Sequence, residues 1–399
     1  MSADVWSKVT AFRAAADGRA RGLYPFFRAF DVHEGPEAVI EGRRVTMFGS
    51  NNYLGLTTHP KVREAAREAV RRLGTSTTGS RLINGTLRLH EELEQRLAAF
   101  LGRPSALVFT TGYQVNLAVC SALLAEGNVA VVDRGVHASI YDGVRLATSS
   151  GARMVRFGHN SASSLHRHLS RLDDGEGALV MMDGVFSADG VVARLDEIVP
   201  VIRAHRARVM IDDAHGLGML GPGGRGTVHH FGLESEVDLI GGTFSKSLAS
   251  VGGYLVGDEA VIDYIRHNAS PFIFAASGAP ATLAAALAAL EVMQEETWRI
   301  DRLRENSEYM ARGLRLLGFD IGATTTAIIP ILIGDEERTV EVWRDLLESH
   351  AIYTNPFLFS SVAAGGALLR TSCMATHEQG HLDRGLEAFE AVGRKHGLI

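Results

Sequence analysis

One lysine in a run of small residues gives the clearest sign of chemistry in this chain. Lys246 lies within residues 241–253, a stretch rich in glycine and hydroxylated residues that follows the mostly apolar residues 237–240. We expect a strand that leads into a tight loop, where backbone N–H groups can approach a phosphate closely. An amine in that setting can form a Schiff base with an aldehyde cofactor whose phosphate the hydroxyls hold. The alternative is a surface lysine on a glycine-rich turn.

A carboxylate and a histidine follow a second apolar run. Asp212 closes the run that begins at Val209, and His215 comes three residues later. A buried carboxylate needs a partner. A protonated pyridine nitrogen is one such partner, because the nearby anion keeps the proton on the ring and makes the ring an electron sink. His215 is then placed to hydrogen-bond a phenolic oxygen of the same ring. The alternative for Asp212 is to cap the turn after the strand.

Other residues have side chains suited to an aromatic, anionic ligand. His137 can stack on an aromatic ring, or it is an ordinary polar loop residue. Thr111 and Gly112 come before Tyr113 and a helix, whose N-terminus either binds a phosphate or is simply capped by the threonine. Arg370 lies in an apolar strand, where it either clamps a substrate carboxylate or forms a structural salt bridge.

These residues fall at the ends of a regular series of strands. The runs are continuously apolar and are joined by helical segments, which indicates a parallel sheet covered on both faces. Ligands bind such sheets at the carboxyl ends of the strands. The expected strands are residues 106–109, 129–133, 179–183, 209–213 and 237–240.

The flanking regions show other patterns. Residues 38–48 are two β-rich runs about a Glu–Gly turn, which indicates a hairpin. Pro60 begins a helix that Gly74 ends, and a loop dense in glycine and hydroxyl groups, residues 74–86, comes before a second helix. After about residue 290, amphipathic helices flank two apolar strands. We expect an α/β fold with the following parts: an N-terminal segment (1–50), a large cofactor-binding domain (51–290) and a smaller α+β domain (291–399).

The composition narrows the class of protein. With 399 residues, 46% of them hydrophobic, the chain is an ordinary globular protein. A net charge of −6 argues against a nucleic-acid partner. No apolar run is long enough to span a bilayer, and the first residues lack the apolar core of a signal peptide. Only two cysteines are present, Cys120 and Cys373, so neither a disulfide framework nor a cysteine metal site is expected. Together these features predict a cytoplasmic enzyme.

Three motifs together resemble the α-oxoamine synthase family. They are Asp-Asp-Ala-His-Gly at 212–216, Gly-Thr-Phe-Ser-Lys-Ser at 242–247 and Leu-Leu-Arg-Thr-Ser at 368–372. The resemblance extends from about Arg21 to the C-terminus. It implies a fold-type I pyridoxal 5'-phosphate enzyme that condenses an amino acid with an acyl thioester, with loss of CO2, to an α-amino ketone. It also implies a homodimer with the active site at the subunit interface, and no metal.

The resemblance also implies roles for particular residues. Lys246 would bind the cofactor and carry the Cα proton, Asp212 would hold the pyridine nitrogen and His215 the phenolic oxygen, and His137 would stack on the ring. Arg370 would grip the substrate carboxylate, which governs the choice between decarboxylation and transamination. The remaining expected site residues surround the phosphate, the ring or the substrate: Thr111, Gly112, Tyr113, Ser187, Thr243, Ser245, Asn52 and Ser80.

Local differences bear on the substrates. The loop at 78–86 most resembles the serine palmitoyltransferases. Aminolevulinate synthases carry threonine at Ser80, so serine leaves room for a side chain and favours L-serine or L-alanine as substrate. Relatives carry serine or threonine at Ala275, where the hydroxyl reaches the neighbouring subunit's phosphate, and its loss weakens cofactor retention. Residues 357–365 replace a proline-rich stretch near the substrate entrance, so coenzyme A and acyl carrier protein both remain open as the thiol carrier.

Several alternatives remain open at this stage. Within the family they are an 8-amino-7-oxononanoate synthase, a 2-amino-3-ketobutyrate ligase and a carrier-protein-dependent synthase of a secondary pathway. On the same fold they are an aminotransferase and a retro-aldol lyase, neither of which needs a thioester. The last alternative is a scaffold subunit of a heterodimeric synthase, but such subunits typically lack the lysine that this chain has at 246.

Overall fold

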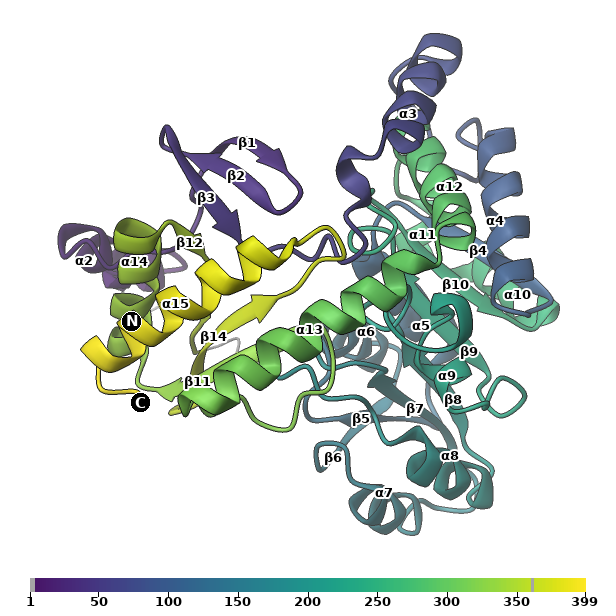
Figure 1. Cartoon of the computed structure of the whole chain (residues 1–399). Coiled ribbons are helices and arrows are strands. Elements are labelled where there is room, and N and C mark those ends of the chain that lie inside the picture. Colours follow the sequence, from purple (N-terminus) through teal and green to yellow (C-terminus); the bar gives the residue numbers. More distant parts are fainter. Residues whose placement is uncertain (1–3, 360–361) are drawn as a thin grey trace.

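The largest feature of the fold is a seven-stranded sheet, seen in a computed structural model that describes residues 4–359 and 362–399 (Figure 1). β10 runs antiparallel to both of its neighbours and every other pair is parallel, which confirms the expected mainly parallel α/β sheet. In spatial order the strands are β4 (Ser105–Phe109), β10 (Gly253–Gly257), β9 (Leu239–Thr243), β8 (Arg208–Asp212), β7 (Gly177–Asp183), β5 (Asn128–Asp133) and β6 (Arg153–Phe157).

The apolar runs form the centre of this sheet. Successive side chains of a strand point to opposite faces, and Val180, Met181 and Met182 in β7 are all fully buried, so both faces are covered. All five expected strands are present. The sequence did not reveal β6, an edge strand with two exposed arginines, or β10, which begins and ends at glycines that usually mark turns.

Most of the helices between residues 60 and 295 pack around the seven-stranded sheet (Figure 1). The expected helix at Pro60 is confirmed, and it ends at Gly74, whose φ of 78° is in the left-handed region that favours glycine. The helices of this region are α3 (Pro60–Leu73), α4 (Arg88–Phe100), α5 (Gly112–Leu123), α6 (Ala138–Thr148), α7 (Ala162–Leu169), α8 (Leu195–Ala204), α9 (Thr227–His230), α10 (Glu259–Asn268), α11 (Ser270–Ile273) and α12 (Pro280–Glu295), with short 3-10 turns at Leu56–Thr58 and Pro222–Gly224.

The glycines before the lysine are not in the loop where the sequence placed them. Gly241 and Gly242 pair with β10, so β9 continues to Thr243 and their backbone groups belong to the sheet. Their small size serves packing: a Cβ on Gly242 would lie 2.5 Å from the Tyr254 ring, and one on Gly241 would lie 2.7 Å from Met210. The prediction of a phosphate-binding loop beginning at 241 is therefore wrong, and the loop begins after Thr243.

A second, four-stranded sheet combines three strands from the N-terminal region with one strand from the C-terminal region. The expected hairpin is confirmed as β2 (Glu37–Ile40) and β3 (Arg43–Met47), joined by Glu41 and Gly42, both with positive φ as a two-residue hairpin turn requires. β1 (Phe30–Glu34) flanks β2, and β12 (Ile352–Tyr353) pairs with β3. The domain limits expected at residues 50 and 290 stay predictions.

The C-terminal region is the expected smaller α+β unit. β14 (Ala367–Ser372) lies between β11 (Ile328–Gly334) and β13 (Asn355–Phe357) in an antiparallel sheet. The helices α13 (Trp298–Leu317), α14 (Glu336–His350) and α15 (Gln379–Lys395) gather beside it (Figure 1).

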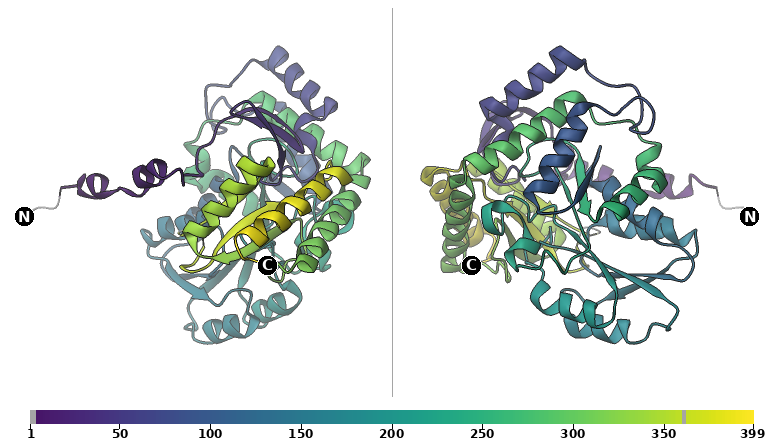
Figure 2. Two further views of the ribbon diagram at one scale, coloured as in Figure 1. Left: turned by 60° about the vertical axis from the view of Figure 1, so that its left-hand side comes forward. Right: turned by 90° about the vertical axis from the view of Figure 1, so that its right-hand side faces the viewer.

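The N-terminal helices lie at the surface, where Ala14, Asp17 and Gly18 line an open pocket together with residues of α14. α1 (Ser7–Ala11) and α2 (Ala14–Ala20) have no buried residue and extend away from the rest of the chain (Figure 2). None of the helices in the described ranges combines the length and apolar character needed to cross a membrane.

Candidate active site

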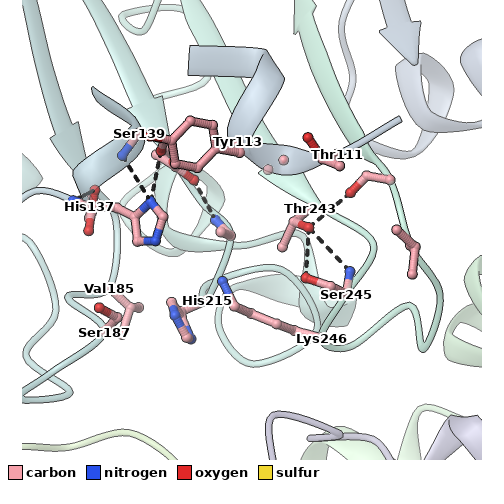
Figure 3. Close-up of a pocket in the computed structure, with 17 residues that line it drawn as sticks. Thr111, Tyr113, His137, Ser139, Val185, Ser187, His215, Thr243, Ser245 and Lys246 are labelled. Carbon is pink, nitrogen blue, oxygen red and sulfur yellow. Dashed lines mark hydrogen bonds between the residues drawn. The ribbon is translucent and has the colours of Figure 1, made fainter. Parts of the chain in front are cut away.

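A cavity of about 360 Å³ opens at the edge of the large sheet where its parallel strands end (Figure 3). A space of this size suits a cofactor-sized ligand. Ten of the thirteen predicted site residues line it: Thr111, Gly112, Tyr113, His137, Ser187, Asp212, His215, Thr243, Ser245 and Lys246. The structure therefore brings together residues that the sequence spreads over more than a hundred positions.

Asp212 presents its carboxylate to this cavity from the last position of β8. Asn116 in α5 donates to Asp212 Oδ2 from 2.7 Å, and the backbone N–H of Ala214 donates to Oδ1 from 3.1 Å. No Lys, Arg or His nitrogen of the described residues lies within 4.0 Å of this carboxylate. A buried anion held by neutral donors has no ion-pair partner among the described residues, and a protonated ring nitrogen would supply one.

Lys246 projects into the cavity from the loop after β9. The buried side chains of Phe244 and Leu248 anchor this loop, and Ser247 Oγ donates to the Leu217 carbonyl from 2.7 Å. Burial lowers the pKa of the Lys246 amine to about 8, although the nearby Asp212 charge favours the protonated form. The amine is therefore partly neutral near physiological pH, as a nucleophile or base must be.

Two histidines that point into the cavity are also kept neutral (Figure 3). Burial lowers the pKa of His215 far below its usual range, and the charges of Lys246 and Arg370 act in the same direction. Burial likewise lowers the pKa of His137, which is the N-cap of α6. His137 Nδ1 accepts from the Ser139 N–H at 3.3 Å, so Nε2 carries the ring proton of the neutral form.

The start of α5 and the end of β9 form a narrow polar cradle. Gly112 packs so closely that a Cβ there would lie 2.7 Å from Thr243 Cβ. Thr111 caps α5 by accepting from the Gln114 N–H, and Thr243 Oγ1 donates to the Gly252 carbonyl from 2.9 Å. Ser245 Oγ lies 2.9 Å from Thr243 Oγ1 (Figure 3). Free N–H groups at a helix N-terminus beside hydroxyls are suited to a phosphate.

Arg370 lies behind the cavity wall, in β14. Its Nε donates to the Ser187 carbonyl from 2.6 Å and its Nη1 donates to Asn51 Oδ1 from 2.9 Å. The side chain is buried, and no carboxylate of the described part of the chain lies within 4.0 Å of it. The structural salt bridge considered as an alternative is therefore absent from that part, and a buried guanidinium remains without a counterion.

The other two predicted residues lie outside the cavity. Asn52 is buried and donates to Thr57 Oγ1 from 2.8 Å, and it lines an adjoining opening together with Lys246. Ser80 lies in the loop between α3 and α4, where it forms an isolated β-bridge with Ala276. Among the described residues, no group of three His, Cys, Asp or Glu side chains could hold a metal ion.

Comparisons with known proteins identify the family of this chain. A family model described as aminotransferase class I and II matches residues 43–389. A serine palmitoyltransferase of Sphingobacterium spiritivorum is 42% identical over 385 residues, 96% of each protein. An 8-amino-7-oxononanoate synthase of Exiguobacterium sibiricum is 43% identical over 378 residues, 95% of this chain and 96% of that one. A solved structure of serine palmitoyltransferase from S. paucimobilis aligns with this structure over 100% of both chains, with a TM-score of 0.96 and 36% sequence identity. The chain belongs to the aminotransferase class I and II family, and within it to the α-oxoamine synthases.

The site of this α-oxoamine synthase fits pyridoxal 5'-phosphate, the family's cofactor. Asp212 offers an uncompensated anion for the ring nitrogen, Lys246 a partly neutral amine, and the Gly112–Thr243 contact a cradle beside a helix N-terminus. The chain is thus a C-acyltransferase of fold-type I, and its reaction is the decarboxylative condensation of an amino acid with an acyl thioester. The scaffold-subunit alternative is excluded.

Sequence reasoning missed two buried polar residues of this site. Asn116 bonds Asp212, and its amide inside an otherwise apolar helix face was a signal that could have been used. Tyr53 places its hydroxyl 2.7 Å from His215 Nδ1, although 162 positions separate the two residues. No local pattern around Tyr53 suggests that contact.

Proposed function

We propose that this α-oxoamine synthase condenses L-serine or L-alanine with a fatty-acyl thioester. The observation that carries the amino-acid half is the buried Arg370 guanidinium, which has no carboxylate partner in the described ranges and contacts the cavity wall through Ser187. An α-carboxylate is the counterion that such a fork recognises. The serine palmitoyltransferase relatives support the acyl half, at 42% and 43% identity.

Each cavity residue has a proposed part in that reaction. The bound pyridoxal ring supplies the electron sink for the pair left at the substrate Cα. Asp212 keeps the proton on the ring nitrogen, and His215 donates to the phenolic oxygen. Lys246 Nζ removes the Cα proton and returns one after CO2 leaves, which requires the partly neutral amine that its pKa of about 8 provides.

The other cavity residues bind and orient. All seven residues line the cavity. His137 would stack on the ring, Tyr113 and Ser187 would face its edges, and Thr111, Gly112, Thr243 and Ser245 would hold the phosphate. Arg370, with Asn52 nearby, would hold the substrate carboxylate, the group that later leaves as CO2. The electron pair at Cα would attack the thioester carbonyl carbon, the C–S bond would break, and the departing thiolate would take up a proton; CO2 would leave afterwards.

We further propose a homodimer with the active site at the subunit interface. Ser80 lies outside its own chain's cavity, in a loop that Ser277 Oγ holds by donating to the Gly85 carbonyl. The same surface exposes large apolar side chains: Leu82 is 57%, Ile83 76% and Phe274 84% exposed. A second copy would cover them and bring its Ser80 loop to the first copy's cavity.

The thiol carrier and the compartment are also proposals. The stretch 357–365 begins at Phe357, the last residue of β13, whose ring centroid lies 5.7 Å from the Arg370 guanidinium. Ser360 and Ser361 of that stretch lie outside the described residues. We propose either coenzyme A or acyl carrier protein as the thiol carrier, and both are to be tested. Both thiols, Cys120 and Cys373, are buried and unpaired, which is compatible with the cytoplasm.

An absorbance titration tests the substrate assignment. The protein loaded with pyridoxal phosphate is titrated with glycine, L-alanine and L-serine, and acyl-coenzyme A esters of increasing length are then added while thiol release is followed. We expect serine or alanine, but not glycine, to change the spectrum at low concentration and to support thiol release. Saturation by glycine alone would contradict the role of Ser80, and a spectral response without thiol release from any thioester would favour the aminotransferase or lyase alternative.

A further inference from the structure

A continuous line of buried hydrogen bonds leads from the cavity to the C-terminal unit. Tyr53 Oη lies 2.7 Å from His215 Nδ1, and Arg370 Nη2 donates to the same oxygen from 3.2 Å. Tyr53 is 0% and Arg370 2% exposed. Tyr53 does not line the cavity, so it acts on the reaction only through the residues that it bonds.

The direction of these bonds follows from counting protons. Arg370 has no acceptor, so it must donate to the phenol oxygen. The phenol then has one proton to give, either to His215 Nδ1 at 2.7 Å or to Asn51 Oδ1 at 3.2 Å. Asn51 Oδ1 already accepts from Arg370, whereas the imidazole nitrogen is nearer and more basic. The cation on the phenol oxygen also makes the phenol a stronger donor.

The surroundings of His215 support the same assignment. The titratable groups that face it are Lys246, Arg370 and His137, and a positive charge on any of them disfavours a proton on both nitrogens of His215. A neutral imidazole carries one proton. If Nδ1 accepts from Tyr53, that proton is on Nε2, the nitrogen left to donate into the cavity.

We propose that Tyr53 is a positioning residue that fixes the Nε2–H tautomer of His215 and ties it to Arg370. This rests on the proposed function, in which His215 donates to the phenolic oxygen of the cofactor and Arg370 holds the substrate carboxylate. Tyr53 thereby connects the residue that tunes the ring with the residue that orients the amino acid. Without the hydroxyl, His215 Nδ1 has no donor and the ring can exchange its tautomers.

Tyr53→Phe in the cofactor-loaded enzyme tests this role. A donor to the phenolic oxygen stabilises the more anionic form of the cofactor, so its loss should move the pH midpoint of the cofactor's absorbance change upward by about one unit. We expect kcat to fall about tenfold, whereas the KM for the amino acid should change by less than about threefold, since Arg370 keeps Ser187 and Asn51.

Tyr254→Phe is a matched control. Tyr254 is also fully buried, but its hydroxyl has no hydrogen-bond partner in the described part of the chain. This variant should leave the pH midpoint, kcat and KM unchanged. Equal shifts in both variants, or no shift in a folded Tyr53→Phe protein, would overturn the proposal.

A measurement on the unmutated protein covers the case in which Tyr53→Phe fails to fold. Nitrogen-15 NMR of histidine-labelled apoprotein, with His215 assigned by its absence in His215→Asn, reports which ring nitrogen carries the proton. We expect an unprotonated Nδ1, and a proton on Nδ1 would refute the relay. The pH midpoint and the NMR measurement need no thioester, so the substrate assignment can fail while the relay holds, and the reverse.

Discussion

The buried Lys246 amine, which the loaded enzyme needs for catalysis, should destabilise the folded apoprotein. Its pKa is about 8 in the folded chain against 10.5 in an unfolded one, so the unfolded state binds more protons between these values. Folding therefore carries a penalty that is fully present below pH 8 and is relieved as the pH rises towards 10.5. Lys246→Met removes the penalty, and we expect the variant apoprotein to be more stable than the parent.

The size of this effect follows from the shift in pKa. A difference of about 2.5 units corresponds to about 3 kcal/mol at pH 7, and the same relation leaves about 2 kcal/mol at pH 9. Lys246 is partly accessible through the cavity, and water there screens its charge, so these values are upper limits. The sign and the decline with pH are the firmer part of the prediction.

Urea unfolding of both apoproteins at several pH values between 7 and 9.5 measures the difference. Subtracting the parent at each pH cancels the other groups that titrate in the range, such as Asp213, whose pKa burial raises to about 7. Lys61→Met is the matched control, because ion pairs with Glu295 and Glu291 raise the pKa of Lys61 instead. A Lys246→Met protein that is less stable, or whose gain does not change with pH, would refute the reasoning.

Three further substitutions test single parts of the site. Gly112→Ala puts a Cβ 2.7 Å from Thr243 Cβ, so the affinity for pyridoxal phosphate should fall about tenfold in an absorbance titration. An unchanged affinity would contradict the proposal that the phosphate binds between Gly112 and Thr243. Asp212→Asn keeps the shape but not the charge, so thiol release should slow by at least about 100-fold while the cofactor still binds, and near-normal turnover would contradict the role of the anion. Arg370→Lys loses the planar fork, so the KM for the amino acid should rise about tenfold with the KM for the thioester unchanged, and the opposite pattern would place Arg370 at the thioester.

The sequence was most informative where side chains follow buried strands. Asp212, His215 and Lys246 could be placed together because the carboxyl ends of parallel strands share one edge of a sheet. The antiparallel strand β10 could not be foreseen, since its terminal glycines look like a turn. Gly241 and Gly242 misled for the same reason: they are small to admit Tyr254 and Met210, not to bend the chain.

Contacts between segments that are distant along the chain could not be predicted from the sequence. Tyr53 lies against His215 in the fold, and no spacing rule relates positions 162 apart. For Ser80 the structure of one chain is not enough, because the proposed role of this residue depends on a second copy of the chain. The resemblance to the α-oxoamine synthases supplied that role, and the position of Ser80 outside its own cavity leaves it to be tested.

The most direct test of the account is the stoichiometry of one reaction. Carboxyl-labelled L-serine and L-alanine are incubated with the loaded enzyme and a long-chain acyl-coenzyme A, and CO2, free thiol and α-amino ketone are measured together. We predict equal amounts of all three products for at least one of the two amino acids, and none with Lys246→Ala. An α-keto acid or an aldehyde formed without CO2 or thiol release would contradict the account.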